Sequence, residues 1–207
     1  MKKLVIIAIF SLAFTNLSAQ EIEYGNFTDK KSAVKMEFLS PLGGNLTFGY
    51  ERYLKNWMGV EGKIGIIGIG TDVDDRDARG AFVKIGPKFK LKPDFVEEGL
   101  RGSHYLRGGY IRPEVAFGFY TQNENRFTTL GNENERESIS TGTIMINYGK
   151  QYVLSNVMTL DWYLGVGYGW SSGNTSDEGD YNFGWVNGGT DSPIAFSAGL
   201  TIGFLVK

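Results

Sequence analysis

The strongest constraint on this chain is a two-residue alternation of apolar and polar side chains that recurs in eight segments. Within residues 79–92, for example, Val83 and Ile85 flank Lys84. A period of two is that of a β-strand whose two faces meet different surroundings. The segments are 33–40, 45–54, 57–70, 79–92, 105–121, 140–154, 157–171 and 193–205.

The alternation admits two barrels that differ in which face points inward. A soluble barrel of the lipocalin kind keeps its apolar face inside, whereas a membrane barrel turns that face to lipid. Here the polar faces are dominated by Gly, Ala, Ser and Thr, which suit a narrow interior. Short links alternate with long ones, as in membrane barrels. The short links are 55–56 and 155–156, and the long ones are 71–78, 122–139 and 172–192.

Beyond the N-terminus, no apolar run approaches the roughly 18 residues that a membrane helix needs. A chain of this kind that crosses a bilayer must do so as a closed barrel, because closure pairs every backbone group. The sequence therefore predicts an all-β fold, an eight-stranded antiparallel up-and-down transmembrane β-barrel located in an outer membrane.

The N-terminus has the pattern of an export signal. Lys2 and Lys3 precede an apolar run over residues 4–14, and small residues at 18–19 follow. We expect cleavage before Gln20. The predicted organisation is a signal peptide at 1–19, a periplasmic segment at 20–32 and the barrel at 33–207.

Composition narrows the possible chemistry. The chain has no cysteine, which excludes disulfides, thiolate catalysis and lipidation through cysteine. Without Lys2 and Lys3 the mature chain has 19 basic and 23 acidic residues, a formal charge of −4. This balance gives no indication of a nucleic-acid partner. The 29 glycines and 14% aromatic residues are typical of a tightly curved β-wall with aromatic residues at its interfaces.

Two stretches resemble strands of a known family. They are INYGKQYVLSNVMTLDWYLGVGYG (146–169) and YIRPEVAFGFY (110–120). They are similar to small outer-membrane β-barrels of Bacteroidetes, OmpA/OmpX-like eight-stranded barrels often classed as a domain of unknown function. The resemblance covers the chain from about residue 33 and implies a fold and a location but no activity. Many such barrels end on an aromatic residue that the barrel-assembly machinery reads, whereas here Phe204 is followed by three more residues. We expect that machinery to read the C-terminal strand through Phe204.

Nine charged residues share the inward parity. Unpaired buried charges are costly, so opposite charges at similar depth should pair. We expect Glu61 to pair with Lys88 and Lys84 to pair with Glu114, forming a network that fills the lumen. The alternative is a set of hydrated charges that line a small water path. The nine are Glu37, Glu51, Glu61, Lys63, Lys84, Lys88, Arg112, Glu114 and Asp161.

Aromatic residues near the predicted strand ends should anchor the barrel at the two membrane interfaces. One predicted girdle lies on the side of the short links and the other on the opposite side. The first comprises Tyr53, Trp57, Tyr105 and Tyr152, and the second comprises Phe119, Tyr120 and Trp170.

No catalytic, cofactor or metal site is predicted. His104, the single histidine, falls at the end opposite to the external lipid leaflet, where a lipid-modifying enzyme would need it. The acidic loop 72–77 lacks the glycine of a calcium-binding loop and has Arg76 at a ligand position. The clustered acids Asp177, Glu178 and Asp180 are expected to be a solvated loop.

These features favour a barrel with a structural or surface-interaction role and no enzymatic activity. Its expected partners are outer-membrane lipid, the assembly machinery and an external partner at the long loops. A narrow, porin-like pore for ions or small solutes is the alternative, and a lipid-modifying enzyme is a third. Eight strands leave a lumen just wide enough for side chains, which disfavours the pore.

Overall fold

The computed structural model describes residues 30–55, 57–72, 76–91, 104–123, 136–173, 180–188 and 192–207. The predicted signal peptide, most of the predicted periplasmic segment 20–32, and Asp177 with Glu178 lie outside them. The elements are β1 (Ser32–Glu37), η1 (Ser40–Gly43), β2 (Asn45–Lys55), β3 (Met58–Ile67), β4 (Arg79–Lys90), β5 (Gly108–Asn123), β6 (Arg136–Leu154), β7 (Met158–Ser171), β8 (Asp180–Tyr181), β9 (Val186–Asn187) and β10 (Ile194–Val206).

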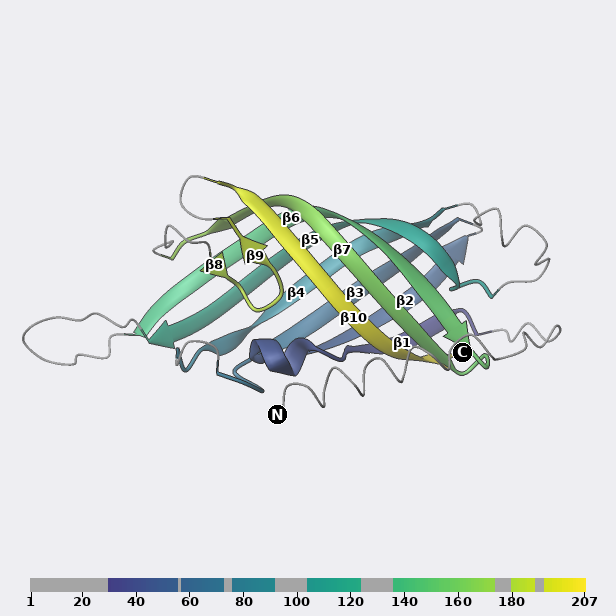
Figure 1. Ribbon diagram of the computed structural model, residues 1–207, viewed down its shortest axis with the longest axis horizontal. Helices are drawn as coiled ribbons and strands as arrows, with labels where there is room; N and C mark the ends of the chain where they lie inside the picture. Colours follow the sequence, from purple (N-terminus) through teal and green to yellow (C-terminus); the bar gives the residue numbers. More distant parts are fainter. Residues whose placement is uncertain are drawn as a thin grey trace, which may run out of the picture.

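Eight of these strands form a closed barrel. The order is β1-β2-β3-β4-β5-β6-β7-β10, and β10 pairs again with β1, so the sheet has no free edge along these strands. Every neighbouring pair is antiparallel. Figure 1 shows the strands winding obliquely around the barrel axis. The prediction of an all-β, closed, eight-stranded antiparallel barrel is confirmed.

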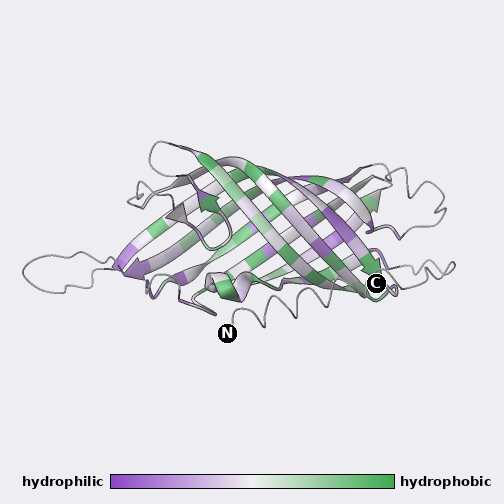
Figure 2. Cartoon of the chain, in the orientation of Figure 1, coloured by the Kyte–Doolittle hydropathy of each residue, from purple (hydrophilic) through white to green (hydrophobic). Residues whose placement is uncertain are grey.

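The two faces of the wall differ as the alternation predicted. Ile85 and Ile146 are each 61% exposed on the outside, whereas Lys84, one residue from Ile85, is 2% exposed on the inside. Figure 2 shows apolar and polar residues alternating along the strands. No helix in the described ranges is long and apolar enough to cross a membrane.

Several boundaries differ from the prediction. β1 ends at Glu37, whereas the alternation predicted a strand as far as residue 40. η1 follows, with Pro41 in the first turn of this short 3-10 helix. β5 and β6 pair as far as Asn123 opposite Arg136, so the long link expected at 122–139 is shorter. A register irregularity lies in β2, between Tyr53 and Lys55.

The barrel has two distinguishable ends. The end that holds Ser32 of β1 and Val206 of β10 is called the terminal end below. The opposite end holds η1 and the links after β3 and β7, and it is called the plug end. Figure 1 shows β8 and β9 at the plug end, away from the C-terminus.

The link 172–192 was expected to be an external loop, but part of it folds back into the barrel. β8 and β9 pair with each other, and β9 pairs with β10 through Ala195 opposite Asn187. Phe183 and Trp185, which lie between the two short strands, are 6% and 2% exposed. Residues 180–187, called the plug below, therefore close this end of the barrel.

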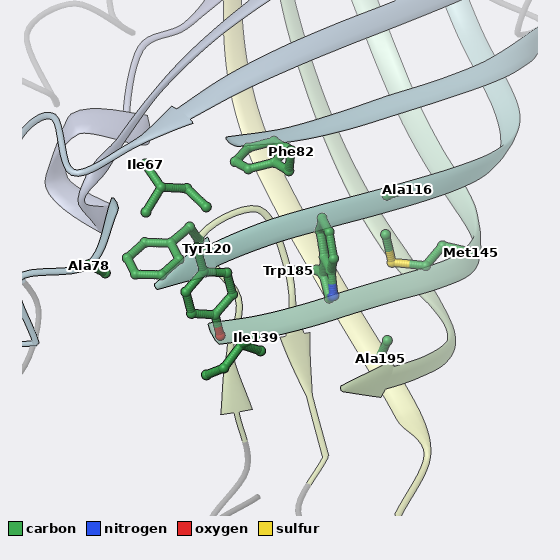
Figure 3. Packing of buried hydrophobic residues seen from close by; sticks show 10 residues of the cluster. Ile67, Ala78, Phe82, Ala116, Tyr120, Ile139, Met145, Trp185 and Ala195 are labelled. Carbon is green, nitrogen blue, oxygen red and sulfur yellow. The ribbon is translucent and has the colours of Figure 1, made fainter. Parts of the chain in front are cut away.

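The plug packs into an apolar cluster. Phe82 of β4 meets the Trp185 ring edge-on with centroids 5.8 Å apart, and Tyr120 of β5 meets Phe183 in the same way at 5.2 Å. Figure 3 shows Trp185 among residues contributed by several strands. The cluster consists of Ile67, Ala78, Phe82, Ala116, Tyr120, Ile139, Met145, Phe183, Trp185 and Ala195.

A smaller apolar cluster closes the terminal end. Leu106, from the link before β5, is 1% exposed and packs with Ala33 and Leu205. Tyr53 and Val153 pack against this group. The interior is therefore divided into an apolar layer at each end and a polar layer between them.

Truncation of the plug tryptophan should show how much the plug contributes. We expect Trp185→Ala to lower the free energy of unfolding by about 3–5 kcal/mol, because the surrounding wall is too rigid to fill the cavity. Urea unfolding in detergent micelles would measure this loss. Val186→Ala, at a neighbouring position that is 42% exposed, is the control and should change stability little. A loss below about 1 kcal/mol for Trp185→Ala would show that the plug is not part of the packed core.

Candidate functional site

The middle layer of the lumen holds ten charged side chains, each at most 7% exposed. Five are basic and five are acidic, so their formal charges cancel. They come from β1, β2, β3, β4, β5 and β7, and nine of them are the residues predicted from parity. The set is Lys35, Glu37, Glu51, Glu61, Lys63, Lys84, Lys88, Arg112, Glu114 and Asp161.

Lys35 lies at the centre of this network, although the predicted set left it out. Its Nζ lies 2.6 Å from Glu51, 2.9 Å from Glu61 and 2.8 Å from Asp161. The signal was present in the sequence, because Lys35 has the same parity as Glu37 on the same strand. One ammonium thus connects carboxylates from three strands.

Lys88 supports the same carboxylates from the opposite side. Its Nζ lies 3.2 Å from Glu51, 3.3 Å from Glu61 and 3.1 Å from Asp161. It also donates to the amide oxygen of Gln151. The predicted pairing of Glu61 with Lys88 is therefore present, as one contact within a larger cluster.

Tyrosine hydroxyls and rings complete this cluster. Tyr110 donates its hydroxyl to Asp161 at 2.9 Å, and its ring lies 3.8 Å below the Lys88 ammonium. Tyr163 donates to Glu37 at 2.5 Å, and Lys63 binds the same carboxylate at 2.6 Å. Hydrogen bonds to charged groups of this kind offset part of the cost of their burial.

Arg112 connects Glu61, which contacts Lys35 and Lys88, with Glu114. Its guanidinium contacts Glu61 and lies 2.9 Å from Glu114. It also stacks over the Tyr163 ring, with 4.8 Å from Cζ to the ring centroid. A planar guanidinium suits such combined ion-pair and stacking contacts better than an ammonium does.

The second expected pair, Lys84 with Glu114, is wrong. Glu114 is taken by Arg112, whereas Lys84 Nζ donates to the carbonyl oxygen of Gly184 in the plug at 2.6 Å. The prediction could not include this partner because it treated 172–192 as an external loop. Lys84 therefore connects the charged layer to the plug.

Three carboxylates of the network, Glu51, Glu61 and Asp161, have oxygens within 4.8 Å of one another. Such a group could hold a divalent cation. Here the ammonium groups of Lys35 and Lys88 each contact all three, so two positive charges already occupy the place of the ion. The arrangement fits an ion-pair cluster better than a metal site.

The predicted girdle residues fall into two groups. Trp57, Phe119 and Trp170 are 56%, 58% and 41% exposed on the outer surface, and Tyr152 is half-buried with the same outward parity. These four have the placement expected of interfacial anchors.

The other three girdle residues do not face outward along the wall. Tyr120 is 2% exposed and packs on Phe183, because it has the inward parity opposite to that of Phe119. Tyr53 is also on an inward position, and it stacks on Tyr105 with ring centroids 5.0 Å apart at the terminal mouth. For Tyr120 and Tyr53, parity and not position at a strand end decides the direction of the side chain.

His104 lies beside the terminal mouth and has a structural contact. Its Nδ1 accepts the backbone N–H of Leu106 at 3.1 Å, which fixes the turn that carries Leu106 into the apolar cluster. Burial, assisted by the charge of Lys90, lowers the pKa of His104 to about 4. The imidazole is therefore neutral at physiological pH.

No family model matches the chain, and no curated protein matches it. Among solved structures it is similar to the N-terminal β-barrel domain of OprF from Pseudomonas aeruginosa, with a TM-score of 0.41 and 14% sequence identity. The match covers 86% of this chain and 98% of that one. The likeness concerns the fold alone.

Removal of Lys35 should be costly, because it leaves the buried Glu51 and Asp161 to share the ammonium of Lys88, which also contacts Glu61. We expect Lys35→Met to lower the free energy of unfolding by about 3–5 kcal/mol. Adding Asp161→Asn should recover part of that loss, since one surplus negative charge disappears. The exposed pair of Arg79 and Asp77, 3.1 Å apart, gives the control: Arg79→Met should cost about 1 kcal/mol or less. If Lys35→Met and Arg79→Met lowered the free energy of unfolding equally, the cost of removing Lys35 would not come from unbalanced charge in the lumen.

The lowered pKa of His104 predicts a pH dependence. The unfolded chain binds a proton at this histidine below about pH 6.5, whereas the folded chain stays neutral down to about pH 4. Stability should therefore fall as the pH drops from 6.5 to 4. His104→Asn keeps an acceptor for Leu106 and cannot titrate, so the fall should be smaller in that variant. Identical stability profiles over this pH range would show that His104 is protonated equally in both states.

Proposed function

We propose that this chain is an outer-membrane barrel with a closed lumen and a structural or surface-interaction role. The observation that carries the proposal is an apolar outer surface wrapped around a charge-balanced interior. Monomeric soluble proteins rarely expose contiguous apolar patches of more than a few hundred Å². Here large apolar residues are exposed on all eight strands of the barrel. Lipid is the surrounding that such a surface fits.

The packing of side chains in the interior supports a closed lumen. Charged side chains at the middle of the lumen are 0–7% exposed, and an apolar cluster covers them at each end. A pore for solutes needs a continuous polar path. Buried apolar side chains, such as Trp185 at one end and Leu106 at the other, interrupt such a path.

A narrow pore remains the second candidate function. The charge network favours it in one respect, since it places polar groups along much of the axis. It would conduct if the plug and the charged side chains moved apart. An activity on lipid is the third candidate, and His104, the residue it would need, is engaged with the backbone of Leu106.

The orientation and partners belong to the same proposal. With the N-terminus in the periplasm, the plug end faces the exterior and the terminal end faces the periplasm. The links after β3, β5 and β7 are then available to an external partner. The barrel-assembly machinery would act on β10. Membership in the Bacteroidetes family stays a prediction from the sequence.

The test of this proposal combines conductance with location. Purified protein in planar bilayers should show no steady conductance, and whole-cell protease treatment should cut between β5 and β6 but not in the plug. Trp185→Ala, which loosens one seal, should leave conductance near baseline because the charge network remains. Steady conductance of the wild-type protein would favour the pore. A change in lipid A mass spectra on deletion of the gene would favour the enzyme.

A further inference from the structure

The wall of the barrel has a break between β4 and β5. The two strands pair continuously as far as Ile85 opposite Val115, and pairing resumes at Phe89 opposite Ile111. The register is the same on both sides, so no residue is inserted. Three consecutive rungs are missing, and the middle one places a proline opposite a proline.

The order of hydrogen-bonded and non-hydrogen-bonded pairs along β4 and β5 shows which hydrogen bonds the middle rung lacks. Leu91 donates its N–H to Gly109 at 2.9 Å, so these two residues mark a hydrogen-bonded rung. Such rungs recur at every second residue of an antiparallel pair, which makes Pro87 and Pro113 a hydrogen-bonded rung too. Neither proline has an N–H. Both hydrogen bonds of the rung are therefore impossible.

The carbonyl oxygens of Pro87 and Pro113 consequently have no backbone donor across the rung. Each of them faces the nitrogen and Cδ of the opposite proline, where another residue would present its amide hydrogen. No side chain in the described ranges donates to either oxygen. The neighbouring Gly86 helps to keep the wall closed, because a Cβ there would lie 2.0 Å from the Pro113 oxygen. A carbonyl group without a hydrogen-bond donor is unfavourable inside a bilayer.

The lumen directly behind this rung also holds polar atoms that lack partners. Arg112 and Glu114 are the chain neighbours of Pro113, and both point inward. Arg112 Nε and Glu114 Oε1 are buried and make no hydrogen bond with the rest of the structure. The residues on either side of Pro113 thus carry an unpaired donor and an unpaired acceptor, in addition to the two proline carbonyls without a donor. Water can satisfy all of them, because it donates and accepts at once.

The position of the gap gives that water a route. Pro87 lies three residues before Lys90, the last residue of β4, which is roughly 10 Å of strand from the terminal end. The barrel mouths, by contrast, are covered by the clusters around Trp185 and Leu106. The side wall is the shorter way for water to reach the charge network.

We propose that the Pro87–Pro113 rung is a hydrated breach in the barrel wall. It binds water between the two proline carbonyls and the Arg112–Glu114 pair, and it is the point at which the charge network exchanges water with the membrane interface. This inference rests on the proposed membrane location. In this proposal water reaches the lumen through the wall, whereas in a pore it would enter through the two ends of the barrel.

Amide hydrogen exchange resolved by NMR would test the breach. In lipid nanodiscs, the amides of Ile85, Phe89, Ile111 and Val115 should exchange about five- to tenfold faster than amides of intact rungs on β6. The double variant Pro87→Val with Pro113→Val restores both N–H groups with side chains that suit lipid. Its four amides should exchange at the rate of the intact rungs.

A matched control is Val115→Ile, which changes a lipid-facing side chain at an adjacent rung without adding an N–H. It should leave all four rates unchanged. Wild-type rates equal to those of intact rungs, or rates that the double variant does not slow, would overturn the breach. The same comparison in detergent micelles measures the exchange rates of these amides whether or not the protein inserts into a bilayer. Failure to insert would therefore count against the proposed location alone.

Discussion

The pairing of β1 with β10 is the interaction on which the rest of the structure depends. It runs from Ser32 opposite Val206 to Glu37 opposite Thr201 and removes the last two free edges of the sheet. Once the wall is closed, each residue of a strand must face either the outside or the lumen. The narrow lumen of an eight-stranded barrel must then be filled by side chains. Lys35, in the middle of β1, reaches the axis because glycines stand beside it on both neighbours, Gly49 and Gly203.

Glycines opposite large side chains solve the packing of the lumen elsewhere too. A Cβ at Gly199 would lie 2.4 Å from the Tyr163 ring, and one at Gly149 would lie 2.5 Å from the Tyr110 hydroxyl. The two tyrosines therefore lie flat across strands that have no side chain at that level. Their hydroxyls reach Asp161 and Glu37 from this position. The high glycine content of the chain thus serves the polar network as well as the curvature of the wall.

Parity along a strand was enough to predict the barrel and nine of its ten buried charges, but it could not assign partners. Glu61 and Lys88 lie on adjacent strands, two residues apart in register, and were paired correctly. Lys84 and Glu114 have the same offset on adjacent strands, but their partners are the plug and Arg112. Lys35 and Asp161 lie on β1 and β7, which are separated by β10, and such contacts across the lumen depend on the shear of the barrel. The plug was missed because its strands are two residues long. Its signal was a short alternation of Tyr181, Phe183 and Trp185 within a polar loop.

Distance alone does not distinguish the charge network from an ordinary surface ion pair. Asp77 and Arg136 at the plug end are 2.8 Å apart, the same separation as Lys35 and Asp161. The first pair is 43–47% exposed and water can replace either partner, so it contributes little to stability. The second is buried within a set whose charges cancel, between the two apolar layers that cover the ends of the lumen. Loss of one member there leaves an uncompensated buried charge, whereas loss of an opposite pair keeps the balance. Charge balance in a closed lumen, more than any single contact, is therefore what makes these residues part of the barrel's structure.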